Sequence, residues 1–167
     1  MNQLGLLVTD MVYDEALDFN EEGYALVKYG EFYNFINEQG EEVFEYISPF
    51  YDSVAIAKQD GKYALVDETG KLLTQTWYDM IYEEEVYWNA GVTRARLNGK
   101  YVLLGLDGIE RSEYYDGILD GDLPDYYSYD EDGEFSDALE EKDTILFWSD
   151  GWYGMRNVQG EMVVRPE

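Results

Sequence analysis

The chain has 167 residues, of which 37 are acidic and 11 basic, so its formal net charge is −26. This excess of carboxylates argues against direct binding to nucleic acid or to an anionic membrane, because lysine and arginine make those contacts. The chain contains neither cysteine nor histidine, which excludes disulfide scaffolds, thiolate zinc sites and cysteine nucleophiles and removes the commonest general base.

The first eight residues are mostly apolar but carry no basic segment, and the run ends at Thr9 and Asp10. Such a run is too short for a signal peptide or a membrane span. We therefore expect a cytoplasmic protein, with the alternative that a secreted chain whose leader has been removed would look the same. We also expect a monomer, kept soluble by its charge.

A short Gly-aromatic unit then recurs along the chain, which is the mark of a repeat protein. Its copies span residues 33–44, 61–73, 99–109 and 151–163. Each copy is interpreted as two strands around a turn that begins with Asn or Asp and ends with Gly. The Asx side chain can accept hydrogen bonds from the backbone of the turn, and Gly supplies a positive φ cheaply.

The residues that carry this turn chemistry are the same in most copies. The predicted first residues of the turns are Asn37, Asp67 and Asn157, and the last are Gly40, Gly70, Gly108 and Gly160. Gly105 replaces the Asx in the third copy, so this turn has weaker side-chain support.

An aromatic residue followed by Asp lies between the copies, and a short apolar strand follows it. The pairs are Tyr13–Asp14, Tyr51–Asp52, Tyr78–Asp79 and Tyr115–Asp116. We interpret the aromatic ring as filling the layer between neighbouring units and the Asp as capping the turn into the next strand. A functional role for these aspartates is the less favoured interpretation.

The turn glycines are 30, 38 and 52 residues apart, which indicates a unit of about 30 residues with insertions in the later copies. The sequence predicts a single all-β domain over 1–167, an array of about four β-hairpin repeats in a twisted sheet or solenoid, with few or no helices. The predicted units are 13–44, 50–73, 77–110 and 114–164, with insertions at 82–91 and 116–143. A stretch at 132–142 could hold one or two helical turns.

This pattern resembles the bacterial WG-repeat family, whose units run Gly-Lys-(Trp/Tyr)-Gly, two apolar residues, an Asx, a Gly and an aromatic-Asp pair. The resemblance covers roughly residues 13–164. Only Gly154 keeps the second glycine of the name-giving dipeptide, since Ala64 and Val102 stand there in other copies. The resemblance implies stacked β-hairpins and a binding scaffold, and it implies no reaction.

The longer insertion concentrates acidic side chains, with 12 carboxylates and a single basic residue, Lys142, between Asp116 and Asp143. A calcium loop is disfavoured, because alignment on Gly133 puts Ser128 and Leu139 at positions that require carboxylates. A solvated loop and an interaction surface remain equally favoured. The predicted partner-binding residues lie in the two insertions: Glu83, Glu84, Glu85, Trp88, Asp120, Asp122, Asp125, Tyr126, Tyr127, Tyr129, Asp130, Glu131 and Asp132.

No nucleophile elbow and no Gly-rich phosphate loop is present in the sequence. Two carboxylates would suffice for a glycosidase, but with 37 acids some pair always lies near the required separation, so this count has no diagnostic value. We therefore predict no enzyme, no catalytic residue, no cofactor and no metal. The tryptophans Trp77, Trp88, Trp148 and Trp152 raise a carbohydrate- or choline-binding hypothesis, although aromatic residues at fixed repeat positions are more often core.

The predicted function is the binding of a basic protein in the bacterial cytoplasm. Its most specific form is an immunity protein that neutralises a cationic toxin such as a nuclease effector. A phage anti-defence protein or DNA mimic would use the same electrostatics. A wall- or carbohydrate-binding repeat module is the alternative from a different class.

Overall fold

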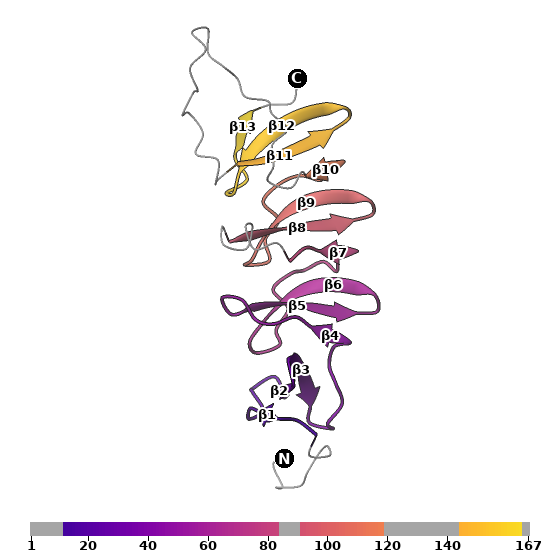
Figure 1. Cartoon of the computed structure of the whole chain (residues 1–167), viewed down its shortest axis with the longest axis vertical. Helices are drawn as coiled ribbons and strands as arrows, with labels where there is room; N and C mark the ends of the chain where they lie inside the picture. Colours follow the sequence, from indigo (N-terminus) through magenta and orange to yellow (C-terminus); the bar gives the residue numbers. More distant parts are fainter. Residues whose placement is uncertain (1–11, 84–90, 119–143, 165–167) are drawn as a thin grey trace. The chain divides into compact units, whose positions relative to one another are not determined.

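The computed structural model describes residues 12–83, 91–118 and 144–164, and throughout these ranges the chain forms antiparallel β-strands and no helix (Figure 1). The predicted all-β hairpin fold is confirmed. The strands described are β1 (Glu15–Ala16), β2 (Tyr24–Tyr29), β3 (Phe32–Asn37), β4 (Tyr46–Ile47), β5 (Val54–Gln59), β6 (Lys62–Asp67), β7 (Met80–Ile81), β8 (Val92–Leu97), β9 (Lys100–Gly105), β10 (Gly117–Ile118), β11 (Thr144–Ser149), β12 (Trp152–Asn157) and β13 (Met162–Val164). The suggested helical turns at 132–142 lie outside the described residues.

Packing divides the chain into two compact units, each with its own core. The first consists of residues 1–81 with 106–108, and the second of 82–105 with 109–167. In the first unit, β1 to β6 form one sheet in chain order. In the second, β10 to β13 form another sheet in chain order, and β8 and β9 form a hairpin.

Each unit is built from hairpins of two six-residue strands joined by a two-residue turn (Figure 1). In the β5–β6 hairpin the turn is Asp60–Gly61, with φ angles of 50° and 72°, and Gln59 pairs with Lys62. Two successive positive φ angles characterise the type I′ turn, whose twist matches that of paired strands and which favours Asp-Gly and Asn-Gly. Asn98–Gly99 and Asp150–Gly151 form the same turn in later hairpins.

The Asx turns predicted from the sequence are present, but at the far ends of these hairpins. The Asp67 Oδ1 accepts hydrogen bonds from the backbone N–H groups of Thr69 and Lys71, at 2.9 and 3.1 Å. Asn37 makes both corresponding bonds, and Asn157 accepts the one from Glu161. The prediction that two strands flank this turn holds in the last copy, where β12 pairs with β13 across it, and is wrong in the other copies, where the residues after the turn form only isolated bridges, such as Val66 with Leu72.

A further copy of this turn precedes β2 and was missed in the sequence. The Oδ1 of Asn20 accepts hydrogen bonds from the N–H groups of Glu22 and Tyr24, and Gly23 closes the turn with φ 81°. Tyr24 follows Asn20 by four positions, as Lys71 follows Asp67, so the same side-chain hydrogen bonding forms a turn at a different connection of the repeat.

Before each short strand, a carboxylate caps the hairpin turn that follows. The Asp14 Oδ2 accepts a hydrogen bond from Gly30 N at 2.7 Å, and Asp116 Oδ2 accepts one from Asp150 N at 2.8 Å. Asp14 and Asp116 therefore have a structural capping role, but the turn that each caps is a hairpin turn further along the chain and not, as predicted, the turn into the strand that directly follows it.

In the second repeat, Phe44 and Glu45 stand in the place predicted for Tyr51 and Asp52. Phe44 is buried, and Glu45 Oε1 accepts the Asp60 N–H at 3.0 Å. Asp52 instead lies at φ 48° in a tight turn between Tyr51 and Val54. Assigning Asp52 to the cap was therefore wrong.

Alternating apolar residues of the paired strands supply the cores. In the first unit Phe35, Ile47 and Val66 are fully buried within one cluster, and Trp77 packs against it. This position of Trp77 confirms the interpretation of that tryptophan as core. In the second unit the cluster includes Leu103, Tyr115, Ile145 and Phe147.

Candidate functional site

The basic residues of this acidic chain are largely engaged in contacts within the fold. Of the nine basic residues in the described ranges, seven contact a ring, a carboxylate or a buried carbonyl. They are Lys28, Lys58, Lys62, Arg94, Arg96, Lys100 and Arg156. With a formal net charge of −26, the carboxylates dominate the electrostatic field at the surface.

Three of these cations lie at one repeated position, opposite the tyrosine that follows the hairpin turn. The Lys28 Nζ lies 5.5 Å from the ring centroid of Tyr33, and the Lys58 Nζ lies 5.9 Å from that of Tyr63. In the third hairpin a hydrogen bond from Tyr82 and the Arg96 guanidinium lower the pKa of Tyr101. The first two are cation–π contacts, in which the ammonium group is attracted to the face of the ring.

Two lysines reach instead to the capping aspartates. Lys62 pairs with Asp79, and Lys100 Nζ lies 2.5 Å from Asp116 Oδ1. The hydrogen bonds from Lys100 and from the Asp150 backbone lower the pKa of Asp116. Asp116 therefore joins the hairpin before it to the turn of the hairpin after it, which is a structural role.

Arg156 lies at the centre of a polar cluster in the second unit, with its side chain 12% exposed. It donates hydrogen bonds to the Tyr115 hydroxyl, the Gly160 carbonyl and the Glu113 carboxylate. The Tyr115 ring stacks on Phe147 with centroids 3.9 Å apart. These contacts use all three guanidinium nitrogens within the fold, so the cluster stabilises the repeat and presents no reactive group.

Burial raises the pKa of Tyr115 to about 12, with a further contribution from its hydrogen bond to Glu113. A tyrosine whose folded-state pKa lies above its unfolded value of about 10 contributes stability that is complete below pH 10 and is lost as the pH rises towards 12. We expect the free energy of unfolding to fall by about 2 kcal/mol more in the wild type than in Tyr115→Phe between pH 9 and 11.5. Urea denaturation of both proteins at the two pH values measures this, and equal losses would contradict it.

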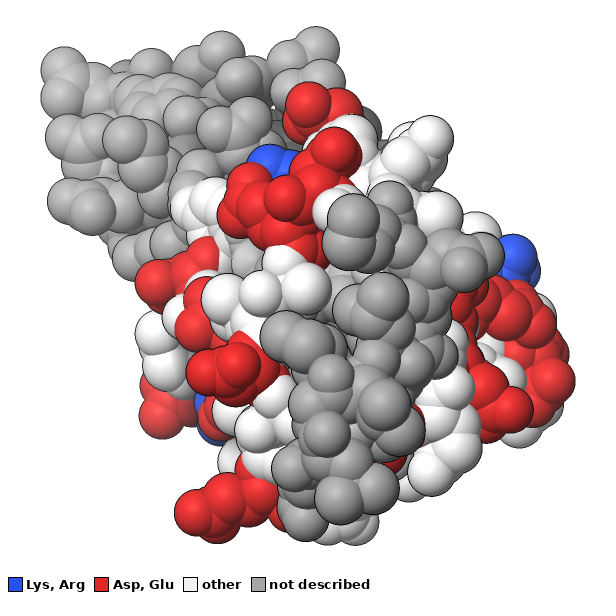
Figure 2. Space-filling view, turned by 90° about the horizontal axis from the view of Figure 1, so that it is seen from below, with Lys and Arg blue, Asp and Glu red and all other residues white. Residues whose placement is uncertain are grey.

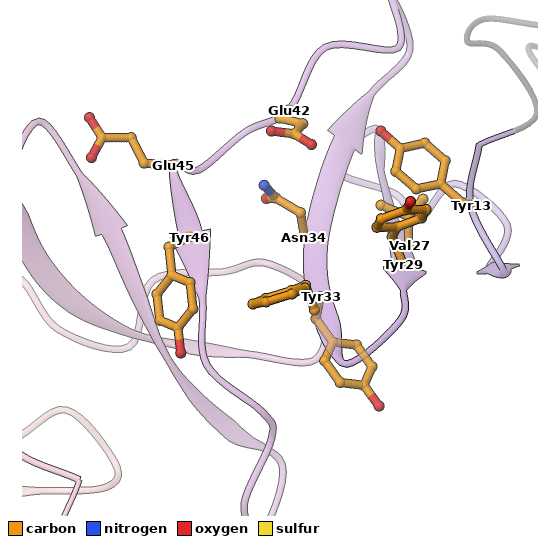
Figure 3. A pocket seen from close by; sticks show the side chains of 9 residues that line it. Tyr13, Val27, Tyr29, Tyr33, Asn34, Glu42, Glu45 and Tyr46 are labelled. Atoms are coloured by element: carbon orange, nitrogen blue, oxygen red, sulfur yellow. The ribbon is translucent and has the colours of Figure 1, made fainter.

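A groove on the first hairpin is the candidate binding site. It has a volume of about 240 Å³ and is lined by Tyr13, Val27, Tyr29, Phe32, Tyr33, Asn34, Glu42, Glu45 and Tyr46. Figure 3 shows Asn34 between Tyr46 of β4 and the pair Tyr13 and Tyr29, with Glu42 beside it. Aromatic walls with a few polar groups are typical of ligand sites in proteins.

Strand pairing places four of the groove residues on one face of the hairpin. Val27 pairs with Asn34 and Tyr29 pairs with Phe32, so alternate residues of β2 and β3 face the groove together. The buried Asn34 amide donates to the Phe44 carbonyl at 2.7 Å and accepts from the Phe35 N–H at 2.8 Å. This fixes Asn34 as a satisfied wall of the groove and leaves Glu42 and Glu45 as its charged groups.

The sequence around the groove is strongly acidic. Residues 12–53 include eleven acidic side chains and one basic side chain, Lys28. Lys28 lies 3.7 Å from the Glu15 carboxylate and over the Tyr33 ring. On the face shown in Figure 2, carboxylates in red far outnumber lysine and arginine in blue. The groove therefore lies in a region of negative potential, which attracts cations.

Most of the predicted partner-binding residues lie outside the described residues, which leaves their role a prediction. Of that set only Glu83 is described, and it is exposed just after β7. The two insertions nevertheless occupy one kind of connection, from β7 to β8 and from β10 to β11, which in both cases joins a short strand to the first long strand of a hairpin.

Of the groove aromatics, the sequence singled out Tyr13, as part of a repeated aromatic–Asp pair, but not Tyr29, Phe32 or Tyr46. The available signal was the position of Tyr29 and Phe32 on either side of Gly30–Glu31, which a two-residue turn places directly opposite each other. Trp152 and Tyr153 are also exposed, at 56% and 58%, on the last hairpin.

Within the part of the chain that the structure describes, no three acidic side chains gather as a metal site. In the same ranges no helix has the length and apolarity needed to cross a membrane.

Comparison with known proteins gives one family. Residues 1–31 and 35–63 match the family model of the WG containing repeat. No curated protein matches the chain.

Among solved structures, similar chains include Kluyveromyces lactis Hsv2 with complete loop 6CD, at 12% identity and a TM-score of 0.33, over 89% of this chain and 49% of that one. KlHsv2 with loop 6CD replaced by a Gly-Ser linker gives 11% identity and a TM-score of 0.33, over 92% and 52%. The chain thus spans about half the length of these structures. The family match over two consecutive units confirms the resemblance drawn from the sequence: the chain carries WG repeats over residues 1–63.

Proposed function

We propose that this chain is a non-catalytic binding module for a basic protein, and most specifically an immunity protein that neutralises a cationic toxin such as a nuclease effector. The WG-repeat match supports a repeat module for binding. The observation that carries the choice of partner is the charge distribution: the net charge is −26, and seven of the nine described cations are engaged within the fold.

The physical chemistry of such a complex follows from these charges. Carboxylates steer a cationic partner towards the acidic surface and increase its association rate. A nuclease binds phosphates through lysine and arginine. An acidic protein that covers those residues occludes the substrate site without any chemistry of its own. The same reasoning applies to a DNA mimic directed against a host nuclease.

The test is a capture experiment in cells that produce the protein, followed by affinity measurements on the purified complex. We expect a basic partner whose affinity falls at least about tenfold between 50 and 500 mM NaCl, because salt screens exposed charge pairs. For a toxin, the complex should also lose nuclease activity. Recovery of no basic partner at low salt, or an affinity indifferent to salt, contradicts the proposal.

The exposed Trp152 and Tyr153 favour a second candidate, a carbohydrate- or wall-binding module, because exposed aromatic rings bind sugars and quaternary ammonium groups. Retention on glycan or choline resins that is lost in Trp152→Ala would establish this function. A chain that flows through both resins would exclude it for these ligands.

A further inference from the structure

We propose that the groove of the first hairpin receives an arginine side chain of the basic partner. This inference rests on the proposed function and specifies one contact of the complex. The groove, of about 240 Å³, is smaller than the pockets of roughly 300–1,000 Å³ that bury drug-sized ligands. Its size therefore suits one long side chain inserted by a protein partner.

The walls of the groove provide surfaces on which a guanidinium can stack. Tyr29 and Phe32 pair directly across β2 and β3 beside the turn, and they are 62% and 64% exposed. Tyr46 on β4 and Tyr13 before β1 add two further rings. Arginine stacks on aromatic faces and is more weakly hydrated than lysine, so its transfer into such a groove costs less.

The groove carries two carboxylates. Glu42 and Glu45 line it, and one oxygen of Glu45 is held by the Asp60 N–H at 3.0 Å. This bond orients the Glu45 carboxylate before any ligand arrives. A planar guanidinium can donate two parallel hydrogen bonds to a carboxylate, whereas an ammonium group acts as a point charge. The amide of Asn34 is satisfied by backbone partners, so the carboxylates determine the charge preference.

Two lysines flank the groove: Lys28 on β2, and Lys58, which pairs with Tyr46 across β4 and β5 and lies over the Tyr63 ring. Lys28 is engaged by Glu15 and by the ring of Tyr33, and it is the one basic residue between positions 12 and 53. The groove thus combines aromatic surface, two carboxylates and a local excess of negative charge, which together select a cationic side chain over a neutral one.

The experiment titrates the full-length protein with three capped amino acids and follows backbone amide shifts by NMR. The probes are N-acetyl-arginine methylamide, the lysine equivalent, and the citrulline equivalent, which keeps the shape of arginine without its charge. We expect shifts confined to the groove residues, with arginine binding at least about threefold more tightly than lysine and about tenfold more tightly than citrulline. Equal binding of arginine and citrulline, or shifts elsewhere, would overturn the proposal.

Variants then locate the site. Glu42→Gln preserves the shape of the side chain, and Phe32→Ala removes an exposed ring, so both should fold. Each is expected to weaken the arginine probe at least about fivefold. Tyr153→Ala, which removes an equally exposed tyrosine from the last hairpin, is the matched control and should bind as the wild type does. Unchanged binding in Glu42→Gln and Phe32→Ala would refute the assignment.

Binding of the natural partner to the same variants distinguishes a failure of this inference from a failure of the proposed function. If a basic partner binds Phe32→Ala and Glu42→Gln as tightly as the wild type, the arginine site is wrong and the proposed function stands. If the arginine probe binds the groove but no basic protein binds the chain, the proposed function fails and the groove remains a site for a guanidinium group.

Discussion

Replacement of Gly160 by alanine is expected to destabilise the second unit by about 2–5 kcal/mol. Gly160 closes the Asx turn after β12 with φ 86°, a region that costs an L-residue about 1–2 kcal/mol. A Cβ at this position would lie 1.8 Å from the carbonyl oxygen of Arg111, which belongs to the preceding repeat. Because that neighbour is backbone, it cannot move aside by a rotamer change, and overpacking adds about 1–3 kcal/mol.

Gly151→Ala provides the matched control for this substitution. Gly151 has φ 84°, but a Cβ there would have no atom within 4 Å. It should therefore show only the cost of the backbone conformation, about 1–2 kcal/mol. Urea denaturation of the two variants measures the difference, which reports the contact between consecutive repeats. Equal losses of stability would mean that the repeats do not approach each other as closely as Gly160 and Arg111 do here.

Replacement of Arg156 by alanine is expected to cost about 3 kcal/mol. The side chain is 12% exposed and donates to Tyr115, Gly160 and Glu113. Its removal leaves acceptors without a partner inside the second unit, each at a cost of about 1–3 kcal/mol when buried. Glu113 is largely exposed and regains water, so its share is small.

Two further variants test whether geometry or charge carries this effect. Lys71→Ala removes one positive charge from an exposed site, and it should change the free energy of unfolding by less than about 0.5 kcal/mol. Arg156→Lys keeps the charge but cannot reach three acceptors at once, so it should remain substantially destabilised. A fully stable Arg156→Lys protein would show that charge alone is required there.

Local turn chemistry was the most predictable part of this fold. Asn37 and Asp67 were correctly identified as the first residues of Asx turns, because a short side-chain acceptor followed by Gly specifies that geometry over four residues. The same reasoning did not locate the long strands. The dipeptides Asp60–Gly61 and Asn98–Gly99 are strong hairpin signals, but Gly61 and Gly99 were interpreted as the first residues of repeat copies, so the pairing of β5 with β6 and of β8 with β9 was not predicted.

The correspondence between residues of successive repeats was harder to derive where one copy is shorter than the next. In the first repeat, Val43, whose N–H donates to Phe35 O, directly precedes the buried Phe44. In the next repeat, the corresponding residues are Leu73 and Tyr78, and four residues lie between them. In the shortened copy the Asn34 side chain hydrogen-bonds to the backbone of Phe44. In the next copy Tyr63 and Tyr78 hydrogen-bond to each other through their backbones. Pattern matching therefore selected Tyr51–Asp52, and only tertiary contacts identify Glu45 as the cap.

The candidate groove could not be derived from sequence because its residues come from four separate segments, between Tyr13 and Tyr46. Each aromatic residue is unremarkable by itself in a chain with 17 tyrosines. Strand pairing brings Tyr29 and Phe32 together, and the short connection after β3 brings Glu42 and Glu45 beside them. The excess of negative charge, in contrast, was evident from composition.

The connection between each short strand and the following long strand differs in length among the repeats. It has 7 residues between β1 and β2, 6 between β4 and β5, 10 between β7 and β8, and 25 between β10 and β11. Loop-closure entropy grows only with the logarithm of length, so extension from 6 to 25 residues costs about 1.3 kcal/mol. New sequence can therefore be inserted into this connection at little thermodynamic cost. Foreign peptides grafted there should be displayed without changes to the hairpins, and natural variants can diversify there.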